Sequence, residues 1–228
     1  MLFASVQMNS QDDKKVNLEN AEKFIDRAAE SGAKVVTLPE MFNYLGPDDK
    51  KWENAEEIPG PTIKKIKSKA REYDIYVLAG SIPEKVEGND RLFNTSVLIN
   101  PDGNIIAKYR KLHMFDIDIE GQPTYRESSL IQPGEDVVTV ETEIGTLGLS
   151  ICYDLRFPEL FRRLTKKGAQ IVFLPAAFTL HTGKDHWEPL IRARAIENQL
   201  FFIASGQIGY HPPERECYGN SMIVDPWG

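Results

Sequence analysis

The sequence GAKVVTLPEMF at residues 32–42 returns in closely similar form as GAQIVFLPAAF at residues 168–178. Each stretch is an apolar strand pattern that begins after a glycine and ends at a Leu-Pro pair. Each also follows an amphipathic helical pattern, and the second helix is expected to begin at Pro158 and to end near Lys167, with Gly168 as its cap. The two stretches therefore predict the same local unit, a helix followed by a buried strand, at two places in the chain.

The similarity extends beyond these two strands. Each is followed by a second helix, a second strand and a third strand that ends in a turn. In the first half these elements are expected at residues 62–73, 75–80 and 94–103, and in the second half at residues 185–199, 200–205 and 220–228. Because several elements agree in order, an internal duplication explains them better than chance similarity of short segments. Two similar halves predict an α/β fold in which two mixed sheets pack face to face with helices outside, a four-layer α-β-β-α sandwich with pseudo-twofold duplication.

The duplication also makes a prediction about the end of the chain. In the first half a Pro101-Asp102-Gly103 turn leads into a hairpin strand at residues 105–109, whereas the second half stops at the equivalent turn. We therefore expect residues 1–228 to form one domain whose natural chain continues beyond residue 228. A chain of 228 residues is long enough to bury one sizeable core.

The composition is that of an ordinary globular protein, with 41% hydrophobic and 27% charged residues. A net charge of −7 without a basic cluster argues against nucleic-acid binding and membrane-surface binding, and no apolar stretch approaches the length of a membrane span. The N-terminal residues lead directly into a strand pattern and carry no basic signal-peptide region. We therefore expect a cytoplasmic protein in which both cysteines, Cys152 and Cys217, are free thiols.

Three chemically active side chains follow three predicted strands. Glu40 comes after the strand at residues 34–38, Lys111 after the hairpin strand at residues 105–109, and Cys152 directly after an apolar strand at residues 146–151. Ligands of α/β proteins bind beyond the carboxyl ends of strands, so these positions are candidates for one site.

A carboxylate, an ammonium and a thiol together suit the hydrolysis of an amide. Cys152 would attack the carbonyl carbon to give a thioester, and Glu40 would take the thiol proton and return it to the leaving amine. Lys111 and the backbone N–H of Tyr153 would stabilise the oxyanion. A surface ion pair for Glu40 and a solvated charge for Lys111 are the alternatives for each residue taken alone.

The sequence around Cys152 predicts a reactive thiol on a sharp turn. The strand stops at the cysteine, and a helix opened by Pro158 follows, so Cys152 is expected near unpaired backbone N–H groups and a positive helix dipole. Both would favour the thiolate form. The alternatives are a buried cysteine that only packs, and a redox-sensing thiol if Cys217 lies close to it.

Four motifs carry a resemblance to the nitrilase superfamily of carbon–nitrogen hydrolases. They are LPEMF at residues 38–42, YRKLH at 109–113, ICYDLRFPE at 151–159 and DPWG at 225–228, and the family's Glu-Lys-Cys triad matches Glu40, Lys111 and Cys152 in that order. The resemblance implies an α-β-β-α sandwich and a homodimer or higher homo-oligomer. It also implies a second glutamate beside the triad, Glu127, which would orient Lys111 or position water; an exposed loop glutamate is the alternative.

Within this family the chain looks like the branch of omega-amidase and deaminated glutathione amidase, on the stretches KLHMFDID at residues 111–118 and AFTLHTG at 177–183. The resemblance implies release of ammonia from the terminal amide of a small substrate that also bears a carboxylate. Arg156 would bind that carboxylate, because a guanidinium binds it in a bidentate manner, and Thr182 would add a hydroxyl. The alternatives are an ion pair of Arg156 with Asp154 or Glu159, and a local turn bond for Thr182.

Two other functions stay open at this point. An N-carbamoyl amino acid amidohydrolase is the runner-up within the family, and a catalytically silent dimeric binding module is the alternative from another class. The histidines do not predict a metal site, because His181 and His186 lie five residues apart without a cysteine or carboxylate pair at ligand spacing. We expect no metal, no cofactor and a small-molecule amide as the substrate.

Overall fold

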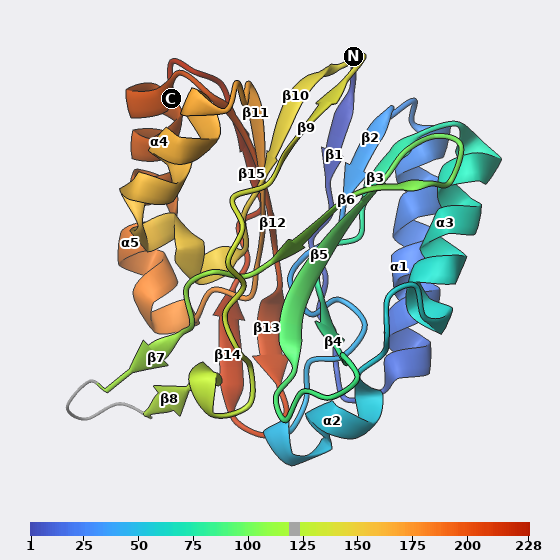
Figure 1. Ribbon diagram of the computed structural model, residues 1–228, viewed down its shortest axis with the longest axis vertical. Helices are drawn as coiled ribbons and strands as arrows, with labels where there is room; N and C mark the ends of the chain where they lie inside the picture. The colour runs from blue at the N-terminus through green and yellow to red at the C-terminus, as the bar shows by residue number, and fades with distance from the viewer. Residues whose placement is uncertain (119–123) are drawn as a thin grey trace.

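The computed structural model describes residues 1–118 and 124–228. Two β-sheets pack face to face, and helices cover the outer face of each sheet (Figure 1). In spatial order, the first sheet consists of β1 (Phe3–Ser5), β2 (Val35–Thr37), β3 (Tyr76–Leu78), β5 (Phe93–Ile99) and β4 (Ile82–Glu84), with β6 (Ile105–Arg110) also paired to β5. The second sheet consists of β15 (Met222–Val224), β12 (Phe201–Gly206), β11 (Ile171–Ala176), β10 (Gly145–Leu149) and β9 (Thr139–Thr142).

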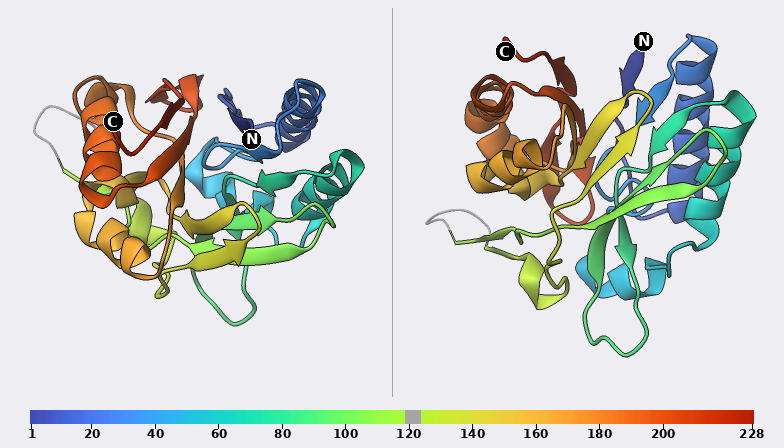
Figure 2. Two further views of the ribbon diagram at one scale, coloured as in Figure 1. Left: turned by 90° about the horizontal axis from the view of Figure 1, so that it is seen from above. Right: turned by 45° about the horizontal axis from the view of Figure 1, so that its top comes forward.

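The helices form the two outer layers. Those outside the first sheet are α1 (Lys14–Glu30) and α3 (Pro61–Tyr73), and those outside the second sheet are α4 (Pro158–Lys166) and α5 (Leu180–Asn198), as Figure 2 shows from above. None of the helices within the described residues is both long enough and apolar enough to span a membrane.

The two sheets are built by the same connections. In the first, β1, β2 and β3 are parallel and β5 pairs with β3 in the antiparallel direction. In the second, β10, β11 and β12 are parallel and β15 pairs with β12 in the antiparallel direction. This shared order confirms the α-β-β-α sandwich of mixed sheets predicted from the repeated sequence.

The strands of the first sheet contribute side chains to two separate hydrophobic clusters, one on each face of the sheet. Along a strand successive side chains point to opposite faces. Val35 and Leu78 accordingly pack in the cluster between the sheets, together with Phe173 of β11. Their neighbours Val36 and Val77 pack in the cluster beneath α1 and α3. These side chains are fully buried, and burial of each contributes about 1.5–3 kcal/mol of hydrophobic stabilisation.

The helix termini are set by local chemistry. The Asp13 carboxylate caps α1 by accepting from the N–H groups of Lys15 and Val16, both at 3.0 Å. Pro158 begins α4, and Gly168 follows that helix with φ +87°, a left-handed conformation that glycine adopts without steric penalty. The predicted start and cap of this helix are therefore present.

One helix begins earlier than its sequence predicts. α5 starts at Leu180, five residues before the expected start at Asp185, because Thr179 adopts the extended backbone of a helix cap. Gly183 lies in its first turn, and a β-carbon there would come within 2.4 Å of the Tyr218 side chain. Glycine normally weakens a helix but is needed here for close packing, so the sequence pattern places the start of this helix too late.

Short segments gather at the end of the molecule away from the chain termini, at the bottom of Figure 1. They are η1 (Asp48–Lys50), α2 (Lys51–Asn54), β7 (Asp116–Ile117), β8 (Tyr125–Arg126), η2 (Glu127–Ser129), η3 (Cys152–Arg156), β13 (Ile208–His211) and β14 (Arg215–Tyr218). The carboxyl ends of the parallel strands point toward this region, so the loops that follow those strands meet there.

Candidate active site

Cys152 stands on a sharp turn after β10. Both the N–H and the hydroxyl of Ser150 donate to the carbonyl oxygen of Phe173, at 3.1 and 2.8 Å, which fixes the end of β10 against β11. Cys152 itself has φ +45°. This left-handed backbone costs a non-glycine residue about 1–2 kcal/mol, so the surrounding structure must hold it. The side chain is buried, with 6% of the residue exposed.

Glu40 is held at both carboxylate oxygens. Oε1 accepts from Asn94 Nδ2 at 2.8 Å and from Lys111 Nζ at 2.9 Å. Oε2 accepts from the backbone N–H of Ala177 at 2.7 Å. Ala177 follows Ala176, the residue that occupies the Glu40 position in the second repeat, so the two equivalent strand ends contact each other here. Only one of the two repeats therefore supplies a carboxylate.

Lys111 lies between two carboxylates. Its ammonium is 2.9 Å from Glu40 Oε1 and 2.9 Å from Glu127 Oε2. Its own backbone N–H donates to the Asn94 carbonyl oxygen at 2.9 Å, which ties the end of β6 to β5. The side chain is 2% exposed, so its charge depends on these two partners and not on water.

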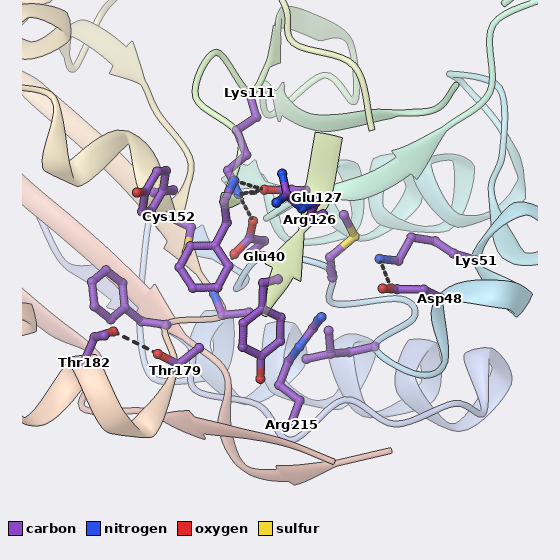
Figure 3. Close-up of a pocket in the computed structure, with 17 residues that line it drawn as sticks. Glu40, Asp48, Lys51, Lys111, Arg126, Glu127, Cys152, Thr179, Thr182 and Arg215 are labelled. Atoms are coloured by element: carbon purple, nitrogen blue, oxygen red, sulfur yellow. Dashed lines mark hydrogen bonds and ion pairs between the residues drawn. The ribbon is translucent and has the colours of Figure 1, made fainter. Parts of the chain in front are cut away.

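Glu127 belongs to the same cluster. It begins η2, and its Oε2 also accepts from the backbone N–H of Phe115 at 2.7 Å. Its Oε1 lies 3.3 Å from Asn94 Nδ2. The structure thus brings together all four side chains singled out for chemistry, Glu40, Lys111, Glu127 and Cys152, and lines one cavity with them (Figure 3).

The charges in the cluster depend on one another. Burial by itself raises the pKa of Glu40, but the attraction of Lys111 and the hydrogen bonds to the carboxylate outweigh it, so the pKa lies below its usual value. Burial by itself lowers the pKa of Lys111, and Glu127 and Glu40 reverse this and raise it well above the ordinary value. Glu40 is therefore a carboxylate and Lys111 an ammonium at neutral pH.

The predicted thiolate at Cys152 is wrong. Burial raises the pKa of the Cys152 thiol well above its ordinary value, and the Glu40 carboxylate raises it further, while Lys111 opposes this only in part. The segment after the cysteine is also the short η3, and α4 begins only at Pro158. The resting group is a neutral thiol beside a carboxylate, which means that deprotonation needs a base.

A buried carboxylate joins the loops that carry Lys111 and Cys152. Asp154 accepts at Oδ2 from the Tyr109 hydroxyl at 2.6 Å and from the Ile151 N–H at 2.8 Å. At Oδ1 it accepts from the His113 N–H at 3.1 Å, and His113 Nδ1 lies 2.7 Å away. The partners lie on both sides of Lys111 in sequence and immediately before Cys152. Asp154 is a positioning residue that fixes the ammonium relative to the sulfur.

We expect Asp154→Asn to lower kcat by about tenfold to a hundredfold with little change in KM, because small displacements of reacting groups slow catalysis steeply. An amide cannot accept all four of these hydrogen bonds. Steady-state kinetics beside the exposed-site control Asp185→Asn would measure the effect. A variant that loses stability but keeps the wild-type kcat would contradict the positioning role.

The cavity is open to solvent, and apolar and aromatic side chains line it together with the reactive groups, as in most small-molecule sites. Thr182 lines it, and its hydroxyl lies 2.8 Å from that of Thr179. Tyr153 also lines it, and within the described residues no backbone carbonyl accepts from its N–H. That N–H is available to a ligand, as the oxyanion role requires.

Arg156 does not line the cavity. Its guanidinium carbon lies 5.2 Å from the centre of the Phe178 ring and 5.6 Å from that of Tyr153, two residues of the cavity wall. Nη1 is 3.3 Å from His186 Nδ1. Within the described residues it forms no ion pair with Asp154 or Glu159. The structure thus separates the two residues expected to bind a carboxylate, with Thr182 at the cavity and Arg156 against its aromatic wall.

Sequence reasoning missed two residues that hold Glu40. Asn94 donates to the carboxylate, and Gln207 donates from Nε2 to the Glu40 carbonyl oxygen at 3.0 Å, while two further bonds join Gln207 to Ser10. Both are buried amides; Asn94 lies on β5 of the first sheet, and Gln207 directly follows β12 of the second. Asn94 matches Asn220 in the repeated pattern, but only the folded chain shows which of the two faces the site.

Comparisons with known proteins identify the family of the chain. The family profile described as carbon–nitrogen hydrolase matches residues 2–228. The chain is 44% identical over 230 residues to a deaminated glutathione amidase from Synechocystis sp., covering 100% of this chain and 85% of that protein. It is 41% identical over 228 residues to an omega-amidase from Homo sapiens, covering 99% and 81%. The crystal structure of a Saccharomyces cerevisiae protein, a member of branch 10 of the nitrilase superfamily, matches with a TM-score of 0.89 and 35% identity, covering 99% and 82%.

Proposed function

This chain belongs to the carbon–nitrogen hydrolase family, within the nitrilase superfamily, and we propose that it is a cysteine-dependent amidase for small amides that bear a carboxylate. One observation carries the proposal. A neutral Cys152 thiol, an ionised Glu40 and a protonated Lys111 line one cavity. These are the protonation states that an amide hydrolase needs before its substrate reacts.

We propose the following first half-reaction. Glu40 takes the proton of the Cys152 thiol as the sulfur forms a bond to the amide carbonyl carbon. The oxyanion of the tetrahedral intermediate is stabilised by the Lys111 ammonium and the Tyr153 N–H. Glu40 then gives its proton to the amide nitrogen, the C–N bond breaks, and ammonia or an amine leaves. The acyl group remains on Cys152 as a thioester.

The second half-reaction uses the same groups in reverse. Glu40, again a carboxylate, takes a proton from water as the water oxygen attacks the thioester carbonyl. The C–S bond breaks, the Cys152 sulfur regains a proton from Glu40, and the acid product leaves. Glu127 would keep Lys111 oriented throughout, because its carboxylate contacts the ammonium whether or not Glu40 carries a proton.

The experiment that tests this function compares the wild type with Cys152→Ala on a panel of amides. Ammonia release would be followed from α-ketoglutaramate, succinamate and an N-carbamoyl amino acid, and amine release from deaminated glutathione. We expect turnover of at least one of the dicarboxylic acid amides, and a loss of about a thousandfold or more in the variant. Circular dichroism of the variant would confirm that it is folded.

The other outcomes have clear meanings. Release of ammonia from the N-carbamoyl amino acid alone would indicate that the protein is an N-carbamoyl amino acid amidohydrolase. Full activity in Cys152→Ala would contradict the cysteine mechanism. No release from any compound would favour a silent binding module, which a thiol-reactive probe directed at Cys152 would then test.

We further propose that Thr182 contacts the carboxylate on the acyl part of the substrate and that Arg156 attracts the same carboxylate from beside the cavity wall. Thr182 would donate a hydrogen bond within the cavity, and Arg156 would supply positive charge from the wall formed by Phe178 and Tyr153. We expect Arg156→Gln to raise KM for succinamate by about tenfold to a hundredfold and Thr182→Val by about threefold to tenfold. Butyramide, which lacks the carboxylate, is the matched control. Equal effects on both amides would contradict this assignment.

A further inference from the structure

The turn that presents Glu40 has an unfavourable backbone conformation. Met41, the next residue, has φ +53°, a left-handed conformation that a non-glycine residue keeps only where the surrounding structure holds it. Ser81, between β3 and β4, holds the turn from the first sheet. Its Oγ accepts from the Met41 N–H at 3.1 Å, its carbonyl oxygen accepts from the Phe42 N–H at 3.2 Å, and its N–H donates to the Pro39 carbonyl oxygen at 3.3 Å. These contacts fix the chain on both sides of Glu40.

The backbone of Glu40 itself is held from the other half of the molecule. Gln207, which directly follows β12, donates from Nε2 to the Glu40 carbonyl oxygen at 3.0 Å. Ser10 orients both ends of this amide, because Oε1 accepts from the Ser10 N–H at 3.0 Å and Nε2 donates to Ser10 Oγ at 2.9 Å. Ser10 Oγ donates in turn to the Phe42 carbonyl oxygen at 2.9 Å. Ser10 and Gln207 therefore contact the turn at two points, Glu40 and Phe42.

His211 holds Ser10 from the side away from this turn. It ends β13 and is fully buried, and its Nδ1 lies 2.6 Å from the Ser10 carbonyl oxygen. Because a carbonyl oxygen can only accept, Nδ1 carries the hydrogen. Burial lowers the pKa of His211, and the contact with Ser10 opposes this only in part, so the ring is neutral at neutral pH. His211 thus supplies one N–H donor and no charge.

This donor comes at a cost to stability. His211 Nε2 is also buried, and among residues 1–118 and 124–228 it has no hydrogen-bond partner. A buried polar atom without a partner destabilises a fold, and an apolar side chain of similar size would avoid that cost. The contact with Ser10 is what an apolar side chain could not supply. The value of the imidazole at this position therefore lies in its hold on Ser10.

We propose that His211 is a positioning residue for the proposed general base, Glu40. It acts through Ser10 and Gln207, and we call these three residues the buried clamp. The inference rests on the proposed amidase function and deepens it by giving a role in catalysis to a side chain that does not line the cavity. The clamp fixes the backbone from which the carboxylate extends, and that carboxylate must reach both the Cys152 sulfur and the leaving nitrogen. Small displacements of such a group slow proton transfer steeply.

The first test is the kinetics of the amide that the wild type cleaves fastest. His211→Leu removes the donor at similar size, whereas His211→Asn keeps an N–H donor near the position of Nδ1. Gln207→Met removes the bond to the Glu40 carbonyl oxygen. Ile63→Val, in the cluster beneath α1 and α3, controls for a loss of stability that does not involve the clamp.

We expect His211→Leu to lower kcat by about tenfold to a hundredfold with KM within about twofold of wild type. His211→Asn should recover part of this loss, and Ile63→Val should leave kcat unchanged. Gln207→Met should cause a loss similar to that of His211→Leu. The double variant His211→Leu/Gln207→Met should lose little more than Gln207→Met alone, because both residues act on Glu40 through the same clamp.

The second test is the acidity of the Cys152 thiol, which reports the position of Glu40. The Glu40 carboxylate raises the pKa of this thiol, so its displacement in His211→Leu should lower the titration midpoint. The same substitution added to Glu40→Gln should not lower the midpoint further, because the carboxylate is already absent. Thiolate absorbance, corrected with the matching Cys152→Ala variants, would measure both shifts.

Two results would overturn the positioning role. One is a kcat within about twofold of wild type in His211→Leu. The other is a thiol midpoint that falls equally with and without the Glu40 carboxylate, which would indicate that water enters around Cys152. If His211→Leu does not fold, Gln207→Met replaces it in both tests. A wild type that cleaves no amide would overturn the proposed function, and the titration would still decide whether the clamp positions Glu40.

Discussion

Glu40→Gln should lower kcat by about a hundredfold to ten-thousandfold and at the same time make the Cys152 thiol more acidic. The first effect follows because glutamine can neither take the thiol proton nor return it to the leaving nitrogen. The second follows because the Glu40 carboxylate is one of the causes that raise the pKa of Cys152. A variant that is almost inactive should thus form its thiolate at a lower pH than the active enzyme.

The ultraviolet absorbance of the thiolate, titrated with pH and corrected with Cys152→Ala, would measure the shift. Cys217 does not interfere below strongly alkaline pH, because burial raises the pKa of its thiol to about 12. Glu57→Gln, at an exposed position, is the matched control. An unchanged or higher titration midpoint in Glu40→Gln would contradict the contact between the carboxylate and the sulfur.

Lys111→Met should remove activity and also destabilise the fold at neutral pH. The variant leaves the carboxylates of Glu40 and Glu127 buried together without their shared cation. Removal of one member of a buried ion pair costs about 3–5 kcal/mol, so we expect a loss of this size in the free energy of unfolding. Loss of oxyanion stabilisation should lower kcat by about a hundredfold or more.

The pH dependence of this loss follows from the pKa shifts. The pKa of Glu40 is lowered in the folded protein, so its stabilising contribution is present above the unfolded value and is lost as pH falls through the folded value. The pKa of Lys111 is raised, so its contribution is present below the unfolded value and is lost as pH rises through the folded one. The stability difference between wild type and Lys111→Met should therefore be large at neutral pH and should shrink in acid.

Urea unfolding across this pH range would measure the difference. Lys64→Met, at an exposed site on α3, controls for the substitution, and adding Glu127→Gln to Lys111→Met should restore part of the stability because one buried charge is removed. A stability loss that does not depend on pH would contradict the electrostatic explanation.

Much of the fold can be predicted from the repeat because the rules that govern it are local. An apolar strand that follows an amphipathic helix must bury both faces, and two copies in the same order give two sheets with the same connections. The strand-end positions of Glu40, Lys111 and Cys152 are likewise visible in sequence, because the carboxyl ends of parallel strands meet in space.

The protonation state of Cys152 could not be predicted in this way. The sequence shows a turn before a helix, which favours a thiolate, whereas the pKa depends on burial and on Glu40, a residue distant in the chain. Asn94 and Gln207 escape prediction for the same reason, since their amides reach Glu40 only after the sheets pack. The position of Arg156 could not be predicted either, because its side chain packs against an aromatic surface that residue spacing does not indicate.

Mass spectrometry of an acyl-enzyme would show whether the reaction passes through a thioester on Cys152. A nitrophenyl ester of the best acyl group acylates without needing protonation of its leaving group. At alkaline pH the Cys152 thiol of Glu40→Gln, whose pKa is no longer raised by the carboxylate, loses its proton to the solvent, and the variant lacks the base that hydrolyses the thioester. We predict that this variant accumulates one acyl group, located on the peptide that contains Cys152, while the wild type turns the ester over. The absence of an adduct on Cys152, or an adduct on another residue such as Cys217, would contradict Cys152 as the nucleophile.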